Sequence, residues 1–110
     1  MKGYQITFFT QQARHYKGDL VPEWLLHQAQ ELGLRGGTIV LGAEGIGHNG
    51  KFHSSHFFEL SDQPVEVSMI VTEEEAEKLF QRIQDENVYI FYSKSPVEFG
   101  YLGDPAFGNA

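Results

Sequence analysis

One stretch of the chain gathers most of the residues that could do chemistry. Residues 42–64 hold four glycines and three histidines. The run GIGHNG at 45–50 has the letters of the G-x-G-x-x-G dinucleotide fingerprint, which requires a helix that begins at the glycines and receives a pyrophosphate. The run KFHSSHFF follows and has no helical stripe, so we expect no Rossmann site. A backbone nest for a small anion stays open, and an ordinary loop is the alternative.

The three histidines of this stretch could bind a metal. His48, His53 and His56, with Glu44 or Glu59, would offer imidazole and carboxylate ligands to zinc or another divalent ion. Their spacing matches no zinc motif on a defined element, so solvated or hydrogen-bonded loop histidines are the alternative.

Basic residues are scarce, which limits the partners that the chain can bind. It has eight Lys and Arg against fifteen Asp and Glu, a formal charge of −7. Nucleic acids and anionic membranes are bound through cationic patches, so we expect neither nucleic-acid binding nor direct membrane insertion. Five basic residues fall in loops or near strand ends and could together hold a phosphate or carboxylate, ordinary surface charge being the alternative. They are Arg14, Lys17, Arg35, Lys51 and Lys94.

The composition of the 110 residues predicts a single domain over 1–110. No run approaches the roughly 18 apolar residues of a membrane-spanning helix, and with no cysteine present we expect a cytoplasmic protein. The sequence offers no spaced carboxylate pair and no arguable Ser-His-Asp arrangement, so no enzymatic activity is expected. It identifies no cofactor.

Hydrophobic periodicity predicts four strands and two helices. Strands are expected at 3–10, 38–41, 65–71 and 88–93, and helices at 22–32 and 73–86. Thr72 and Glu75 form a capping box before the second helix. Residues 11–20 are expected to be a linker, 42–64 a long connection, and 95–110 a loop. The order β-α-β-β-α-β predicts an α+β, ferredoxin-like sandwich, an antiparallel sheet with both helices on one face.

The helix-free face of this sheet is predicted to carry apolar groups. Aromatic and β-branched side chains are expected there, so another subunit should cover it. The residues are Gln5, Thr7, Phe9, Ile70, Tyr89 and Phe91, and the opposite set of strand residues is the alternative if a register differs. Some ferredoxin-like sheets bind RNA through aromatics on their first and third strands, but the third strand here, VEVSMIV, has none.

Three segments resemble a known family over about residues 1–103. They are MKGYQITFFT, the run from Gly42 to Glu77, and FYSKSPVEFGYLG. They are similar to the PII-like proteins of domain-of-unknown-function family 190. The resemblance implies a PII-like homotrimer with inward-facing sheets and small effectors, often adenine nucleotides, bound in clefts between subunits. It also implies that residues 42–64 are a T-loop-like segment that moves with ligand and contacts a partner protein.

We therefore expect an effector-sensing signalling protein that binds a small anion and regulates a partner, either a membrane-transport protein or an enzyme. The family motifs that carry over are Gly42, Glu44, Gly45, Gly47, Gly50 and His53, and Lys94, Pro96 and Glu98. With the basic residues nearby, the expected ligand-binding set is Arg35, Gly42, Glu44, Gly45, Gly47, Gly50, Lys51, His53 and Lys94. The alternative is a trimer that binds a divalent metal through His48, His53 and His56.

Overall fold

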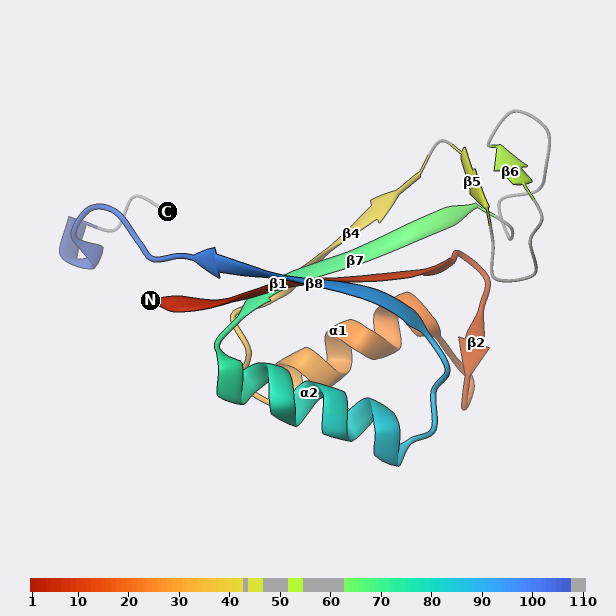
Figure 1. Cartoon of the computed structure of the whole chain (residues 1–110), viewed down its shortest axis with the longest axis horizontal. Coiled ribbons are helices and arrows are strands. Elements are labelled where there is room, and N and C mark those ends of the chain that lie inside the picture. Colours follow the sequence, from red (N-terminus) through yellow and green to blue (C-terminus); the bar gives the residue numbers. More distant parts are fainter. Residues whose placement is uncertain (43, 47–51, 55–62, 108–110) are drawn as a thin grey trace.

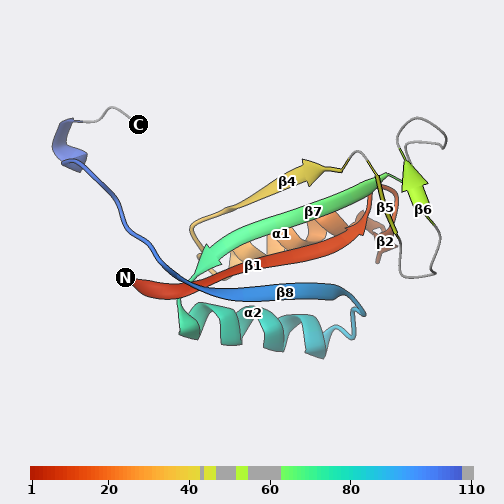
Figure 2. The ribbon, with the colours of Figure 1, turned by 45° about the horizontal axis from the view of Figure 1, so that its top comes forward.

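The computed structural model describes residues 1–42, 44–46, 52–54 and 63–107. Its body is one four-stranded sheet with both helices on the same face (Figures 1 and 2). The sheet strands are β1 (Lys2–Gln11), β4 (Gly37–Leu41), β7 (Pro64–Val71) and β8 (Phe91–Glu98), and the helices are α1 (Val21–Glu31) and α2 (Glu73–Asp85). Shorter elements are β2 (His15–Tyr16), β3 (Asp19–Leu20), β5 (Glu44–Ile46), β6 (Phe52–Ser54) and a 3-10 helix over Pro105–Phe107.

The sheet has the strand order β4-β7-β1-β8, and every neighbouring pair is antiparallel. This is the connectivity of the split βαβ plan, so the predicted ferredoxin-like fold is confirmed. β1 lies in the centre and pairs along nearly its whole length with both β7 and β8.

The core lies between the sheet and the two helices. Alternate residues of β1 and β7 point into it, as the period-two pattern predicted, and meet the apolar stripes of α1 and α2. Its fully buried members include Ile6, Phe8, Leu25, Val65, Val67, Val71 and Leu79.

The ends of the helices follow the signals in the sequence. The capping box is confirmed: Thr72 Oγ1 accepts from the Glu75 N–H at 3.2 Å, and a Glu75 carboxylate oxygen accepts from the Thr72 N–H at 2.8 Å. Pro22 lies in the first turn of α1, and Gly33 follows that helix with φ +73°. A left-handed residue there ends the helix at little cost because glycine has no Cβ.

The prediction for the last sheet strand, 88–93, was wrong in its bounds, since β8 runs over Phe91–Glu98. Asn87, with φ +55°, turns the chain after α2 and sends Val88 into the core, where it is buried. Tyr89, expected on the helix-free face, precedes the strand and is 85% exposed. Pro96 lies within β8 because this strand is at the edge of the sheet, where a missing N–H is tolerated.

Two short hairpins lie where linkers were expected. β2 and β3 pair across a turn at Lys17 and Gly18, both with positive φ, the twist that suits a two-residue hairpin. β5 and β6 pair inside the long connection, so Gly45 lies in a strand.

Candidate functional site

The predicted ligand-binding residues are divided between two ends of the sheet. Gly42 lies at the end of β4, where the long connection begins, and its N–H donates to the Pro64 carbonyl at 2.7 Å. Arg35 lies at the other end, where it meets the first turn of α2 just after β7. An eight-residue strand such as β7 separates these ends by about 23 Å, so one chain does not bring the two residues together.

Within the long connection, the β5–β6 hairpin brings three of the predicted residues into register. Gly45 is opposite His53, and Glu44 is opposite Ser54. At the base of the connection a Cβ on Gly42 would lie 3.2 Å from the Pro64 Cβ, so glycine lets the two strands approach closely. The remaining predicted residues lie outside the described ones: Gly47, His48, Gly50, Lys51, His56 and Glu59.

Metal binding by His48, His53 and His56 stays a prediction. No group of three or more His, Cys, Asp or Glu able to hold a metal occurs in the described part of the chain. Two of the three histidines lie beyond that part, so the hypothesis of a histidine site is untested by the geometry.

Lys94 and Arg35 are the two predicted ligand-binding cations that the structure describes, and Lys94 is the one on the sheet edge. It is exposed on β8 opposite Ile6, with its Nζ 4.2 Å from the centroid of the Tyr4 ring and 5.6 Å from that of Phe80. The Tyr92 ring lies 4.8 Å from Phe80 and extends this aromatic surface along the edge of the sheet. Aromatic faces hold an ammonium in place without neutralising it, so Lys94 remains able to attract an anion.

A groove of about 460 Å³ adjoins this lysine and shares Tyr4 with it. It lies where the start of β1, the end of β8 and the start of α2 meet. The lining residues are Lys2, Gly3, Tyr4, Glu73, Pro96, Val97 and Glu98. Sequence reasoning missed Lys2, Tyr4 and Glu73 as candidates, although the register of β1 against β8 places Tyr4 directly opposite the motif residue Pro96.

The Arg35 guanidinium already interacts with two groups of its own chain. Its Nη1 donates to a Glu75 carboxylate oxygen at 2.7 Å, and its guanidinium lies 4.9 Å from the centroid of the Phe99 ring. Partial burial alone would raise the pKa of Glu75, but hydrogen bonds from the Thr72 N–H and from Arg35 outweigh it and hold that pKa below its ordinary value.

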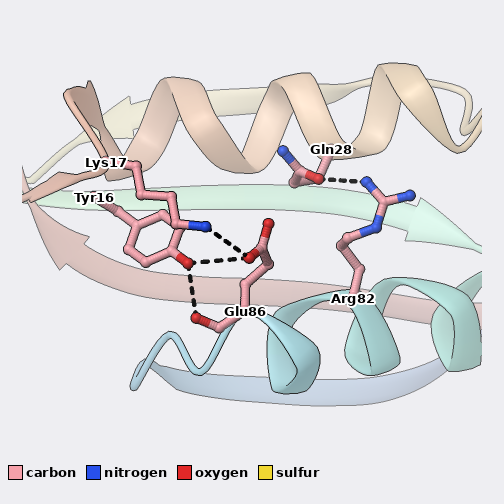
Figure 3. Close-up of polar contacts among 5 residues, drawn as sticks. All are labelled: Tyr16, Lys17, Gln28, Arg82 and Glu86. Carbon is pink, nitrogen blue, oxygen red and sulfur yellow. Dashed lines mark hydrogen bonds and ion pairs between the residues drawn. The ribbon is translucent and has the colours of Figure 1, made fainter.

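Two other basic residues, Arg14 and Lys17, connect the region of the β2–β3 hairpin to the segment after α2. The Arg14 guanidinium donates to the Tyr89 carbonyl, and Lys17 Nζ lies 3.2 Å from a Glu86 carboxylate oxygen. The Tyr16 hydroxyl donates to the Glu86 carbonyl at 2.8 Å (Figure 3). The hydrogen bond to Glu86 raises the pKa of the Lys17 ammonium above its ordinary value, with Tyr16 as a second contributor. These residues therefore hold the fold together at this point.

No helix in the described ranges is long and apolar enough to cross a membrane.

A family model described as Uncharacterized ACR, domain-of-unknown-function family 190, matches residues 3–89. The chain belongs to this family. No curated protein matches the chain in sequence.

Solved structures similar to this family member are PII-like. One of them is CPII, a nitrogen regulatory PII-like protein from Thiomonas intermedia K12 that was solved with ADP, AMP and bicarbonate. Its sequence is 19% identical to this chain. The match covers 92% of this chain and 91% of that chain, with a TM-score of 0.69. A putative PII-like signaling protein from Thermus thermophilus is 20% identical, with 87% of each chain covered and a TM-score of 0.64. The apo form of CPII is 17% identical, with coverage of 88% and 92% and a TM-score of 0.54. The predicted PII-like fold is therefore confirmed.

Proposed function

We propose that this protein is a PII-like effector sensor, with a signalling rather than a catalytic role. It binds a small anionic ligand, an adenine nucleotide or bicarbonate, in clefts between the subunits of a homotrimer. Ligand binding changes how residues 42–64 contact a partner protein, which is a membrane-transport protein or an enzyme. A ligand that prefers one state of such a segment shifts its population by the difference in affinity.

The observation that carries this proposal is the fold, shared with a PII-like protein solved with ADP, AMP and bicarbonate. The placement of the predicted residues supports a site between subunits. Gly42 and Arg35 lie at opposite ends of the sheet, and Lys94 lies between them at an edge. Because one chain holds Gly42 and Arg35 apart, a single site that uses both must include residues of more than one subunit.

The helix-free face supports the homotrimer. Four large apolar side chains are exposed on it: Phe9, Val40, Ile70 and Phe91. Phe91 alone is 72% exposed and contacts Phe9, with the ring centroids 5.6 Å apart. Large apolar side chains exposed on one face of a sheet are typical of a surface that another subunit covers.

The decisive experiment measures calorimetric affinities for ADP, AMP and bicarbonate together with the mass in solution. We expect a trimer that binds at least one of these ligands. Lys94→Gln should weaken binding at least about tenfold, because a charge-assisted hydrogen bond contributes about 1.5–3 kcal/mol. Lys78→Gln removes the same charge from an exposed position on α2 and should leave the affinity unchanged. If the wild-type trimer binds none of the three ligands, effector sensing of this kind is wrong.

A further inference from the structure

The helix-free face of the sheet, formed by the four strands that lie side by side in Figure 2, has rows of different chemistry. One row across the strands is hydroxylic: Thr38, Ser68, Thr7 and Ser93. The Thr7 and Ser68 hydroxyl oxygens lie 2.9 Å apart. The next row toward the long connection consists of Val40, Glu66, Phe9 and Phe91. Glu66 is therefore a carboxylate between apolar side chains, on a face that the proposed homotrimer would cover.

The Glu66 carboxylate has no positive group to balance it on this face. Its neighbours across the sheet are Phe9 of β1 and Val40 of β4. The residues of β1, β4, β7 and β8 that alternate onto the helix-free face include no Lys, Arg or His. β5 also contacts β7, and its one titratable residue is a second carboxylate, Glu44. The ion pairs within the described part of the chain use other carboxylates: Glu31, Glu75 and Glu86.

Symmetric assembly would multiply this charge instead of balancing it. If helix-free faces are turned toward one another, each subunit contributes one Glu66 and, from the described strands, no basic side chain. Burial disfavours the ionised form of a carboxylate, and like charges nearby add to that effect. An ionised Glu66 therefore opposes assembly. A protonated Glu66 is a neutral hydrogen-bond donor beside a row of hydroxyl acceptors, which suits a covered surface better.

We propose that assembly of this protein takes up protons at Glu66, so that its subunits associate more tightly as the pH falls. The inference rests on the homotrimer proposed above and adds a pH response to it. Its sign follows from linkage, because lower pH favours the state that binds more protons. General repulsion between chains of net charge −7 acts in the same direction, but every carboxylate of the surface shares that effect, whereas the proposed response belongs to one residue.

The test follows the full-length chain by sedimentation over a range of concentrations, at about pH 5 and about pH 8. The concentration for half-dissociation of the wild type should be at least about tenfold higher at the upper pH, because one unit of change in proton binding at each subunit is worth about tenfold in an equilibrium constant. Glu66→Gln should abolish most of this difference by tightening assembly at the upper pH. Glu77→Gln is the matched control: it removes the same charge from an exposed position on α2 and should behave as the wild type does.

The outcomes separate this proposal from the homotrimer itself. A wild type that stays monomeric at both pH values overturns both. Half-dissociation concentrations that are measurable and equal at the two pH values, or a Glu66→Gln variant that keeps the wild-type difference, overturn the role of Glu66 while the trimer stands.

Thermal unfolding extends the test to a trimer that dilution does not dissociate. Heat separates and unfolds the subunits together, so Tm includes the contribution of assembly. Glu66→Gln should raise Tm at about pH 8 and raise it clearly less at about pH 5. Glu77→Gln should leave Tm close to that of the wild type at both. An equal change of Tm at the two pH values for Glu66→Gln contradicts proton uptake at this residue.

Discussion

The guanidinium of Arg35 lies between two groups from distant parts of the chain, the Glu75 carboxylate at 2.7 Å and the Phe99 ring at 4.9 Å from its centre. It thereby joins the connection before β4, the first turn of α2 and the segment after β8. A residue whose type suggested only anion binding thus has a structural role that spacing along the sequence did not indicate.

Gly3 should be sensitive to the addition of a single methyl group. A Cβ there would lie 2.0 Å from the Val71 carbonyl oxygen and 2.9 Å from the Phe99 ring, so Gly3→Ala must displace backbone. We expect a loss of about 1–3 kcal/mol in the free energy of unfolding, which is roughly 4–8 °C in Tm per kcal/mol for a small domain. Thermal unfolding of Gly100→Ala is the control, because open space surrounds that glycine. Equal Tm values for the two variants contradict the close crossing at Gly3.

Glu75 should make the stability depend on pH at the acidic side. Its pKa is lowered in the folded state from an ordinary value of 4.5. The ionised carboxylate therefore contributes stability that is complete above that value and is lost as the pH falls through the lower, folded pKa. Glu75→Gln should cost about 1 kcal/mol near neutral pH, measured by urea unfolding. The difference between the two proteins should shrink as the pH drops below 4.5 and disappear in stronger acid; a difference that grows in acid refutes the assignment.

Tyr16 should stabilise the fold through its hydroxyl. Tyr16→Phe keeps the ring against Trp24, with the centroids 5.1 Å apart, but removes the donor to the Glu86 carbonyl. We expect a loss of about 0.5–1.5 kcal/mol in denaturant unfolding. Tyr89→Phe, which alters an exposed tyrosine, should stay within about 0.5 kcal/mol of the wild type. If both substitutions have the same effect, the hydroxyl of Tyr16 contributes nothing specific.

The two partners of Arg82 should differ in their effect on stability. Its Nη1 donates to buried Gln28 and also lies 2.9 Å from Glu31, whose side chain is 63% exposed (Figure 3 shows the first contact). Gln28→Leu keeps the volume but removes the buried acceptor, at a cost of about 1–3 kcal/mol. Glu31→Gln should cost less than about 1 kcal/mol, because an exposed ion pair is weak. Urea unfolding of both variants measures this order, and the reverse order is the contrary result.

Removal of residues 45–55 should separate assembly from ligand response. The base of the long connection is closed by the Gly42–Pro64 hydrogen bond and by the Gln12 N–H, which donates to the Gln63 carbonyl at 2.9 Å. The shortened chain should therefore remain a trimer with the Tm of the wild type, while its affinity for ADP falls at least about tenfold. Loss of the trimer in this deletion would show that the segment is structural.

The fold was predictable because its signals are local. Alternation in β1 and β7, the stripe of α2 and the Thr72–Glu75 capping box each act within a few residues, and each is confirmed. The last strand was misplaced because two local signals pointed the wrong way. The apolar run at 88–90 resembles a strand, but it follows a left-handed turn at Asn87 and places Val88 and Ile90 against the core. Pro96 resembles a loop residue but is accommodated at an edge.

The candidate site was predictable only in part, because it depends on which distant residues meet. The motif containing Lys94 was identified, but the placement of Tyr4 beneath its ammonium follows from pairing between β1 and β8. Arg35 was grouped with Gly42 by chemistry alone, and the length of β7 separates them. The type of a residue indicates what its side chain can bind, but the strand order and register determine which residues lie close together in the fold.

The position of β1 in the sheet also determines the order in which the protein can fold as it is made. Thr7 contacts Ser68, 61 residues later, and the Met1 amine bonds to Phe99, 98 residues later. Contacts so far apart in sequence form slowly, and unpaired strand edges attract other chains. β1 leaves the ribosome before both of its neighbours, so the central strand of the finished sheet spends longest in the nascent chain with both edges open.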